Sequence, residues 1–335
     1  MVKDRAFYAN FFKIYSALVL QNVITLSVNL ADNLMLGAYS ETSLAGVAAV
    51  NQIQFIYQQL LMALGDGLVI FCSQYWGKKQ TGPMKKIAAS AMHAALAVGV
   101  LLFVLVSLFP YRAVGMFTTD QAIIGEGVKY LGIIRFTYLF FAVTQLLLAA
   151  LRSVEVVRIA MCLSVVTFFV NCGINYVLIY GRFGAPELGA RGAAIGTLIA
   201  RIIECTVLIV FVVKKEKRLN LKLKDYLQFD RVLCRDYFKI TAPMLVVQGL
   251  WGLNTALQTV ILGHMTAAAI AANSVASTLF MIVKSMAVGA ASTASIYYWK
   301  DHRDGRYQSG ETIFHPAAEI ISGNWDCFRD YSVLY

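Results

Sequence analysis

Apolar runs long enough to cross a lipid bilayer follow one another along most of this 335-residue chain. A helix needs about 20 mostly apolar residues to span the hydrocarbon core, and such runs occupy residues 13–36, 44–71, 87–109, 130–151, 159–181, 190–213, 237–263 and 268–297. In lipid the backbone must satisfy its own hydrogen bonds, which leaves helices and closed barrels. The residue-by-residue alternation that barrel strands require is missing from these runs. We therefore expect an all-α polytopic membrane protein with about eight transmembrane helices.

The composition agrees with a membrane protein, because 59% of the residues are hydrophobic and 14% are charged. Soluble domains carry about 25% charged residues. The net charge of +10 could indicate nucleic-acid binding, but the basic residues gather in short connections between the apolar runs. That distribution is typical of the cytoplasmic loops of membrane proteins. The expected partner is therefore the lipid bilayer and not a nucleic acid.

Lysine and arginine are divided unevenly between alternate connections. The rich set comprises Lys3, Arg5, Lys13, Lys78, Lys79, Lys85, Lys86, Arg152, Arg158, Lys214, Lys215, Lys217, Arg218, Lys222 and Lys224. The poor set comprises Arg112, Lys129, Arg182 and Arg191. By the positive-inside rule the rich set is cytoplasmic. We expect a multi-pass protein of the plasma (inner) membrane with its N-terminus in the cytoplasm.

The longest polar connection, residues 214–236, divides the expected helices into two groups. Residues 1–213 would form a six-helix bundle, and residues 237–296 the first two helices of a second bundle. An internal repeat supports this division, because NLMLG and LAGVA in the first part are similar to TVILG and IAANS, which end at Gly263 and Ser274, in the second. Six runs separate the copies, so the repeat would be parallel, about an axis along the membrane normal. Chance similarity of apolar segments is the alternative.

Asp32 lies in the first apolar run, in the phrase VNLADNLMLG. An acidic side chain facing lipid there would cost roughly 2.5–3.5 kcal/mol, so we expect it to face a bundle interior or a water-filled cavity. Burial favours the neutral form of a carboxyl group, and such a residue can bind a proton or Na+. The alternative is a solvated or capping carboxylate near the helix end, because Gly37 follows five residues later.

Asn171 and Asn175 are spaced i and i+4, so they share one face of a helix. Their amides could hydrogen-bond Asp32 or coordinate an ion through their oxygens. The alternative is a structural role, in which they form hydrogen bonds between neighbouring helices.

Further polar residues in the apolar runs suggest the lining of a substrate cavity. Gln21 and Asn22 add polarity to the first run, and Tyr176 could stack on a hydrophobic cation or face lipid. Asp66 could attract a cationic substrate or pair with a basic residue near the headgroups.

Two more groups of polar residues are expected to contact other parts of the bundle. The second run carries glutamines, which indicate a surface turned toward a cavity or partner helices: Gln52, Gln54, Gln58 and Gln59. Arg201 and Glu204, at i and i+3, are expected to pair with each other.

Motifs for enzymatic or metal chemistry are missing from the sequence. The six cysteines form neither a CxxC motif nor a Cys/His metal spacing, and four of them lie within apolar runs. The chain has no Walker phosphate loop, no HExxH motif and no recognisable Ser/His/Asp arrangement. We expect neither an enzyme nor a cofactor.

Several motifs resemble those of the multidrug and toxic compound extrusion (MATE) transporters. They are the Asp-x-x-x-x-Gly ending of the first run, Ser73-x-x-x-Gly77-Lys78, the segment from Asn171 through Asn175 to Gly181, and the segment from Gly189 to Thr197. Their order and spacing match across residues 13–296. The resemblance implies two six-helix bundles, about 12 spans, and ion-coupled antiport of organic, often cationic, compounds.

The resemblance also implies roles for individual residues. It matches Asp32 to the first-helix aspartate of a proton site, and Thr197 to a position near that site. The family often has an acid where Asn175 stands, which would leave Asp32 as the sole titrating group of the first bundle. Packing against its own helix is the alternative role for Thr197.

The chain departs from the family pattern after residue 296, where the sequence becomes polar and loses its hydrophobic periodicity. Codons for residues 297–307 can be chosen so that reading one base later gives IIGKTIGMGD, which mirrors the Ser73-x-x-x-Gly77-Lys78 motif. We therefore expect residues 297–335 to be an out-of-frame tail on a C-terminally truncated transporter. A native cytoplasmic tail is the alternative.

These observations predict a secondary antiporter that exports organic, cationic compounds in exchange for H+ or Na+. The coupling ion is expected at Asp32, Asn171, Asn175 and Thr197, and the substrate cavity at Gln21, Asn22, Asp66 and Tyr176. A flippase for lipid-linked oligosaccharides is one alternative, with Arg135, Arg201 and Lys284 as possible cavity cations. An inactive truncated product is the other.

Overall fold

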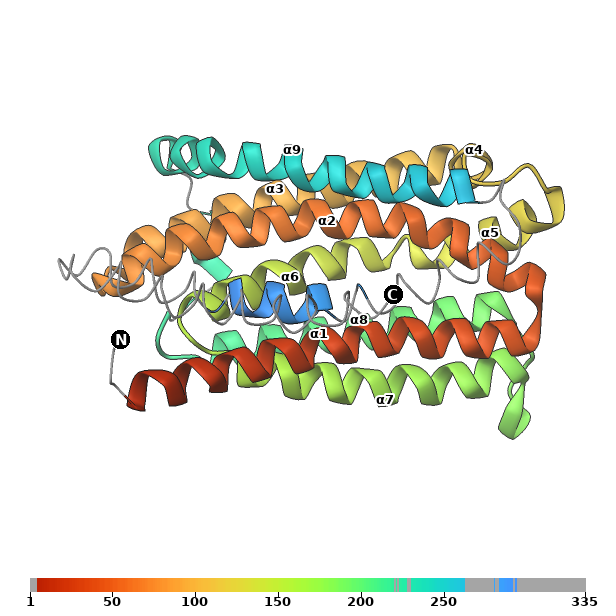
Figure 1. Ribbon diagram of the computed structural model, residues 1–335, viewed down its shortest axis with the longest axis horizontal. Coiled ribbons are helices and arrows are strands. Elements are labelled where there is room, and N and C mark those ends of the chain that lie inside the picture. Colours follow the sequence, from red (N-terminus) through yellow and green to blue (C-terminus); the bar gives the residue numbers. More distant parts are fainter. Residues whose placement is uncertain are drawn as a thin grey trace, which may run out of the picture.

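Helices make up every regular element in the part of the chain that the structure describes. The computed structural model describes residues 5–219, 221, 223–227, 230–262, 280, 283–291 and 293. The α-helices are α1 (Arg5–Tyr39), α2 (Glu41–Gly77), α3 (Thr81–Leu108), α4 (Pro110–Gly115), α5 (Gln121–Ile134), α6 (Thr137–Ser153), α7 (Arg158–Tyr180), α8 (Ala190–Lys214) and α9 (Arg231–Leu262). Short 3-10 turns are η1 (Arg182–Gly184) and η2 (Leu223–Leu227). The long helices run side by side (Figure 1), which confirms the expected all-α fold.

The described residues form six helices long and apolar enough to cross a membrane, or seven if the bent pair α5 and α6 is one span. The protein is therefore a multi-pass membrane protein. The eighth expected span, residues 268–297, lies largely outside the described residues, as do Gly263, Ser274 and the tail from residue 297.

The expected span over residues 130–151 begins earlier than predicted and is not one straight helix. The structure has two helices there, α5 and α6, which meet at a bend of 55°. At the bend the amides of Phe136 and Tyr138 bond carbonyls three residues back, at 3.2 Å each, instead of four. The Arg135 guanidinium lies over the ring of Phe103, 5.6 Å from its centre. The bend thus coincides with a change in backbone hydrogen-bond spacing, and residues 134–137 contain neither proline nor glycine.

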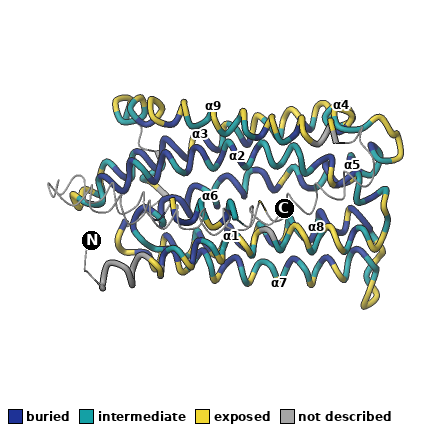
Figure 2. Tube along the Cα trace, in the orientation of Figure 1, coloured by how far each residue is buried: buried dark blue, intermediate teal, exposed yellow. Residues whose placement is uncertain are grey.

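Helix α2 is the central element of the bundle. It contacts α3, α5, α6 and α9, and it is buried over most of its length (Figure 2). Helices α1, α7 and α8 pack together beside it. By contrast, α3 and α9 expose large apolar side chains, among them Leu101, Leu105, Val247 and Leu250. Such an apolar outer surface is what a bilayer would cover.

The connector between α8 and α9 is bound to the bundle through charged contacts. Lys85 at the start of α3 pairs with Asp225 of η2 at 3.0 Å, and Lys86 pairs with Asp230 at 3.1 Å. The guanidinium of Arg218 donates a hydrogen bond to the carbonyl of Val154 at 2.7 Å. The described part of this connection is thus held against α3 and the α6–α7 turn.

Candidate functional site

A chain of polar side chains links α1, α7 and α8 inside the bundle. The Asn175 Nδ2 group donates to Asp32 Oδ1 at 2.6 Å and to Asn171 Oδ1 at 3.3 Å. Asn171 Nδ2 in turn donates to Thr197 Oγ1 at 3.2 Å. The structure therefore brings together all four residues that the sequence predicts for the coupling site.

Asp32 lies inside α1, about two turns before the helix ends at Tyr39. Its carboxylate accepts the Asn175 amide instead of capping backbone groups at a helix end. At 2.6 Å the contact is a short hydrogen bond. This geometry argues against the alternative of a capping carboxylate.

Close packing of α7 against α8 allows Asn175 to occupy this position. The two helices make an extensive contact, and a Cβ atom added at Gly196 would collide with Asn175 Oδ1. Only glycine leaves room there for the amide. Asn175 is fully buried, and its Oδ1 atom has no hydrogen-bond partner among the described residues. This leaves a buried amide oxygen unsatisfied, packed against Gly196.

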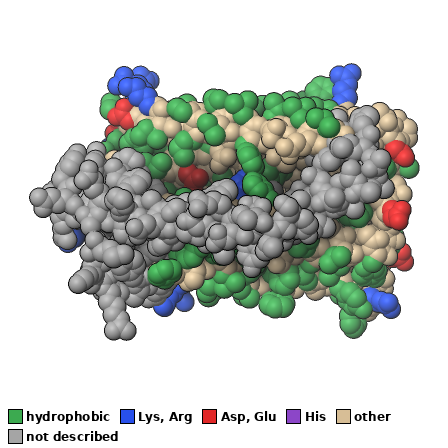
Figure 3. All heavy atoms as spheres, viewed as in Figure 1, with side chains coloured by type: hydrophobic (Ala, Val, Ile, Leu, Met, Phe, Trp, Pro, Cys, Tyr) green, Lys and Arg blue, Asp and Glu red, His purple; other side chains and the backbone are tan. Residues whose placement is uncertain are grey.

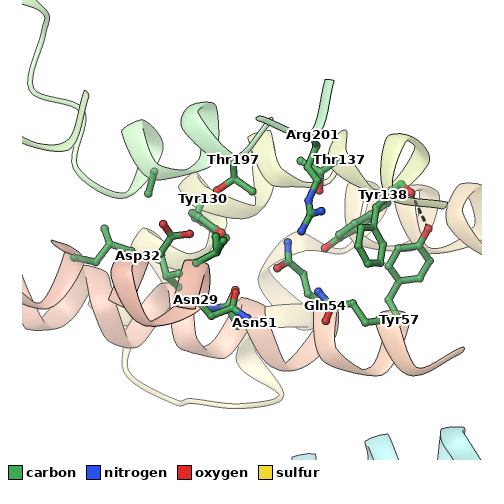
Figure 4. A pocket seen from close by; sticks show the side chains of 16 residues that line it. Asn29, Asp32, Asn51, Gln54, Tyr57, Tyr130, Thr137, Tyr138, Thr197 and Arg201 are labelled. Atoms are coloured by element: carbon green, nitrogen blue, oxygen red, sulfur yellow. Dashed lines mark hydrogen bonds between the residues drawn. The ribbon is translucent and has the colours of Figure 1, made fainter. Parts of the chain in front are cut away.

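A narrow cavity of about 50 Å³ opens beside Asp32. Its walls come from α1, α2, α5, α6 and α8, and Figure 4 shows the polar residues that face it. That volume holds a few water molecules, whereas sites for drug-sized molecules measure about 300–1,000 Å³. In this conformation the cavity suits an ion and water and excludes an organic substrate.

Arg201 is a cation in the wall of this cavity. Its guanidinium pairs with Glu204 at 2.6 Å, as the i, i+3 spacing predicts, and lies 4.9 Å from the centre of the Phe141 ring. Arg201 also lines a second cavity of about 40 Å³, which contains Asn171, Thr197 and Glu204. The Arg201–Glu204 ion pair thus lies next to the polar chain.

Several cavity residues were not singled out from the sequence. They are Asn29, Asn51 and Tyr130. Asn51, Gln54 and Gln58 stand at i, i+3 and i+7 of α2, and this spacing on one helical face could have identified them. The expectation that glutamines of the second run face a cavity is confirmed for Gln54 and Gln58.

The four residues expected in a substrate cavity do not line the cavity beside Asp32. Gln21, Asn22 and Tyr176 are not part of the Asp32 cavity, and Tyr176 is 45% exposed. Asp66 lines a different cavity, where its carboxylate lies 3.9 Å from Arg152. That contact agrees with the alternative of pairing with a basic residue.

Metal binding by several acidic or sulfur ligands has no support in the described part of the chain. No group of three or more His, Cys, Asp or Glu side chains comes together there. An ion at Asp32 would be completed by amide and hydroxyl oxygens, which suit hard cations such as Na+.

Comparison with known proteins finds similarity to one family. Residues 17–177 match the family model described as MatE. The "Probable multidrug resistance protein NorM" of Thermotoga maritima is 28% identical over 204 residues, which are 59% of this chain and 42% of that protein. The "Uncharacterized transporter YisQ" of Bacillus subtilis is 26% identical over 72% of this chain and 52% of that protein. The chain thus spans about half the length of these relatives.

Solved structures agree on the fold. "Crystal structure of MATE in the straight conformation" superposes with a TM-score of 0.82 at 17% sequence identity, over 96% of this chain and 71% of that one. "Crystal structure of eukaryotic MATE transporter AtDTX14" gives 0.80 at 16% identity, over 93% and 69%. These names describe transporters and resistance proteins, in line with the expectation that the chain is no enzyme. The family match over residues 17–177, the relatives and the fold agree that this chain is similar to the MatE (MATE) family.

Proposed function

We propose that this protein takes part in secondary active export of organic compounds, coupled to entry of H+ or Na+ at Asp32. The observation that carries the proposal is the hydrogen-bonded chain from Asp32 through Asn175 and Asn171 to Thr197. It joins the carboxylate on α1 to side chains of two other helices, α7 and α8. The names of the relatives as multidrug resistance proteins support export as the direction.

The polar chain can convert ion binding into helix movement. While Asp32 is ionised, it accepts a hydrogen bond from Asn175. Once the carboxyl group binds a proton, it becomes a donor, and the free Oδ1 of Asn175 becomes its natural acceptor. The amide must then turn, which breaks its bond to Asn171 and alters the contact with Thr197 on α8. Protonation would thus shift α7 and α8 relative to α1.

A proton suits this site better than Na+. Asp32 is the only carboxylate in the polar chain, and its neighbours are amides and a hydroxyl. We also propose that α1 to α8 form one bundle and that α9 begins a second. In this arrangement the Lys/Arg-rich connections and the N-terminus face the cytoplasm of the inner membrane.

The test is uptake of a fluorescent organic compound, zwitterionic or cationic, into liposomes that contain the full 335-residue chain, driven by a pH gradient or, separately, by a Na+ gradient. Asp32→Asn should reduce gradient-driven uptake to the level of protein-free liposomes. The control is Asp120→Asn, which changes an exposed carboxylate that caps α5. Uptake by Asp32→Asn equal to that of the unmodified chain would show that the coupling role is wrong.

A second measurement does not depend on transport. Infrared difference spectra between acidic and neutral pH should contain a carboxylic acid band that disappears in Asp32→Asn. An unmodified chain that inserts, shows no such band and moves no dye would support the inactive alternative and contradict the proposal.

A further inference from the structure

The cavity that Asp66 lines is larger than the one beside Asp32. It lies between α2 and α6 on one side and α9 and residues 283–291 on the other. Its volume is about 290 Å³, several times that of the cavity beside Asp32. This is close to the lower end of the range for small-molecule sites, about 300–1,000 Å³. Acidic and basic side chains are visible deep between the otherwise apolar helices (Figure 3). This cavity has room for part of an organic molecule.

Asp66 and Arg152 contribute opposite charges to the wall, but they pair only loosely. The distance from Asp66 Oδ1 to Arg152 Nη2 is 3.9 Å, which is longer than a hydrogen bond. The Arg152 Nε group is buried and has no hydrogen-bond partner among the described residues. A buried guanidinium nitrogen without an acceptor is costly, so the described residues leave the charge of Arg152 incompletely satisfied.

Lys284 adds a second positive charge to the same cavity. Its Nζ atom lies 3.9 Å from the centre of the Trp251 ring, and no salt bridge in the described part of the chain involves it. The charged side chains of the described wall are thus two cations and one anion. A purely cationic ligand would be repelled by this balance, whereas an anionic group would neutralise it.

We infer that this cavity binds the anionic group of an amphiphilic substrate between Arg152 and Lys284. The substrates would then be zwitterions or organic anions and not simple cations. This inference rests on the proposed export function and names its substrate class. The guanidinium can bind a carboxylate through two parallel N–H groups. Met62 and Met244, in the same wall, provide an adaptable surface for an apolar group of varying shape.

The test compares two dyes that differ in one charge. Rhodamine B carries a free carboxylate and is a zwitterion, whereas rhodamine B ethyl ester is a cation of almost the same shape. Binding of each dye to the full chain in neutral-lipid nanodiscs is measured by fluorescence anisotropy. We expect rhodamine B to bind about tenfold more tightly than the ester, as one well-placed charge contact allows.

Variants test whether this cavity is the source of the preference for rhodamine B over its ethyl ester. Lys284→Met should weaken rhodamine B binding about tenfold and leave the ester unchanged or bound more tightly, whereas Lys284→Arg should keep the preference. The matched control is Lys239→Met, which removes a positive charge from an exposed position on α9. Asp66→Asn should strengthen rhodamine B binding, because it removes the only anion among the described charged residues of the wall.

Equal or tighter binding of the ester by the unmodified chain would overturn the inference, and so would binding of neither dye. An unchanged preference in Lys284→Met would also overturn it. Nanodiscs with phosphatidylglycerol form a further arm: loss of rhodamine B binding there would assign the site to a lipid headgroup instead of a substrate. Dye binding is measured at equilibrium and does not require transport. The dye-binding result can therefore contradict the anion site while the infrared band of Asp32 is still present, so the two proposals are tested separately.

Discussion

Asn175 is the residue on which the geometry of the site depends. Its one amide nitrogen serves both Asp32 and Asn171, while its oxygen fills the space above Gly196. Hydrogen bonds therefore hold the nitrogen of the amide, and packing against Gly196 positions its oxygen. A small change in the space above Gly196 should alter the hydrogen bond to Asp32, although Gly196 itself forms no part of the polar chain.

Gly196→Ala tests this dependence. The new methyl group would occupy the position of Asn175 Oδ1, and overpacking of this kind costs about 1–3 kcal/mol in the free energy of unfolding. Thermal unfolding of the purified protein should show the loss, and the Asp32 infrared band should shift because the amide is displaced. The control is Gly173→Ala on α7, where a Cβ would meet nothing within 4 Å. That variant should change stability by less than about 1 kcal/mol, in the stabilising direction.

The bend between α5 and α6 is the main feature at the scale of elements. The carbonyl of Tyr138, at the start of α6 next to the bend, accepts a hydrogen bond from outside its own helix. The buried hydroxyl of Tyr57 on α2 donates to it at 2.7 Å, as Figure 4 shows. The two rings also lie close, with their centres 5.2 Å apart. Helix α2 therefore supports the bend from the cavity side.

Tyr57→Phe should weaken this support. The change removes one buried hydrogen bond, which contributes about 0.5–1.5 kcal/mol to stability. Hydrogen exchange of backbone amides in residues 134–140 should become faster, while exchange in α7 stays the same. Tyr176→Phe, at an exposed position on α7, is the control and should leave exchange at the bend unchanged. Equal effects of both variants would contradict a specific role for the Tyr57 hydroxyl.

At the scale of the whole molecule, charged contacts hold the start of α9 against α3. Asp230 accepts hydrogen bonds from the Lys86 ammonium at 3.1 Å and from the backbone amides of Val232 and Leu233 at 3.1 and 3.3 Å. These donors, the lysine above all, hold the pKa of the Asp230 carboxyl below its usual value. The contact thus links the beginning of α9 to the first eight helices across the connector.

The contact should weaken in acid. Because the pKa of Asp230 is lower in the folded state, its stabilising effect is complete well above the unfolded value of about 3.9 and is lost as the pH falls through the folded value. The distance distribution between spin labels at residues 82 and 235 should therefore broaden below about pH 4. Asp230→Asn should remove this pH dependence, and Asp236→Asn, in the second turn of α9, should retain it. A distribution that is equally narrow at acidic and neutral pH would contradict the prediction.

Much of the architecture could be predicted from the sequence, because burial in lipid imposes length and polarity on each helix. The expected runs 44–71, 87–109 and 190–213 fall largely within α2, α3 and α8. The bend near Arg135 could not be predicted, since no proline or glycine marks residues 134–137 and the contact of Arg135 with Phe103 involves another helix. Asp120 does mark the start of α5 as an N-cap, a local signal that could have moved the expected start of that helix.

The candidate site could be predicted in part. A lone acid and two amides at i and i+4 are unusual in apolar runs, and the structure joins them. The location of Asp66 beside Arg152, away from the Asp32 cavity, could not be predicted, because it depends on how α2 and α6 pack. Spacing along a helix identifies residues on one face but does not identify which helix that face meets.

The contact between Asn175 and Gly196 also constrains how the family can diverge. Aspartate has nearly the shape of asparagine, so position 175 can gain or lose a charge while position 196 stays glycine. A longer side chain at position 175, or any Cβ at position 196, would require the other position to change in the same lineage. In an alignment of relatives, we therefore expect glycine at position 196 wherever position 175 holds asparagine or aspartate, and coordinated replacement of both elsewhere.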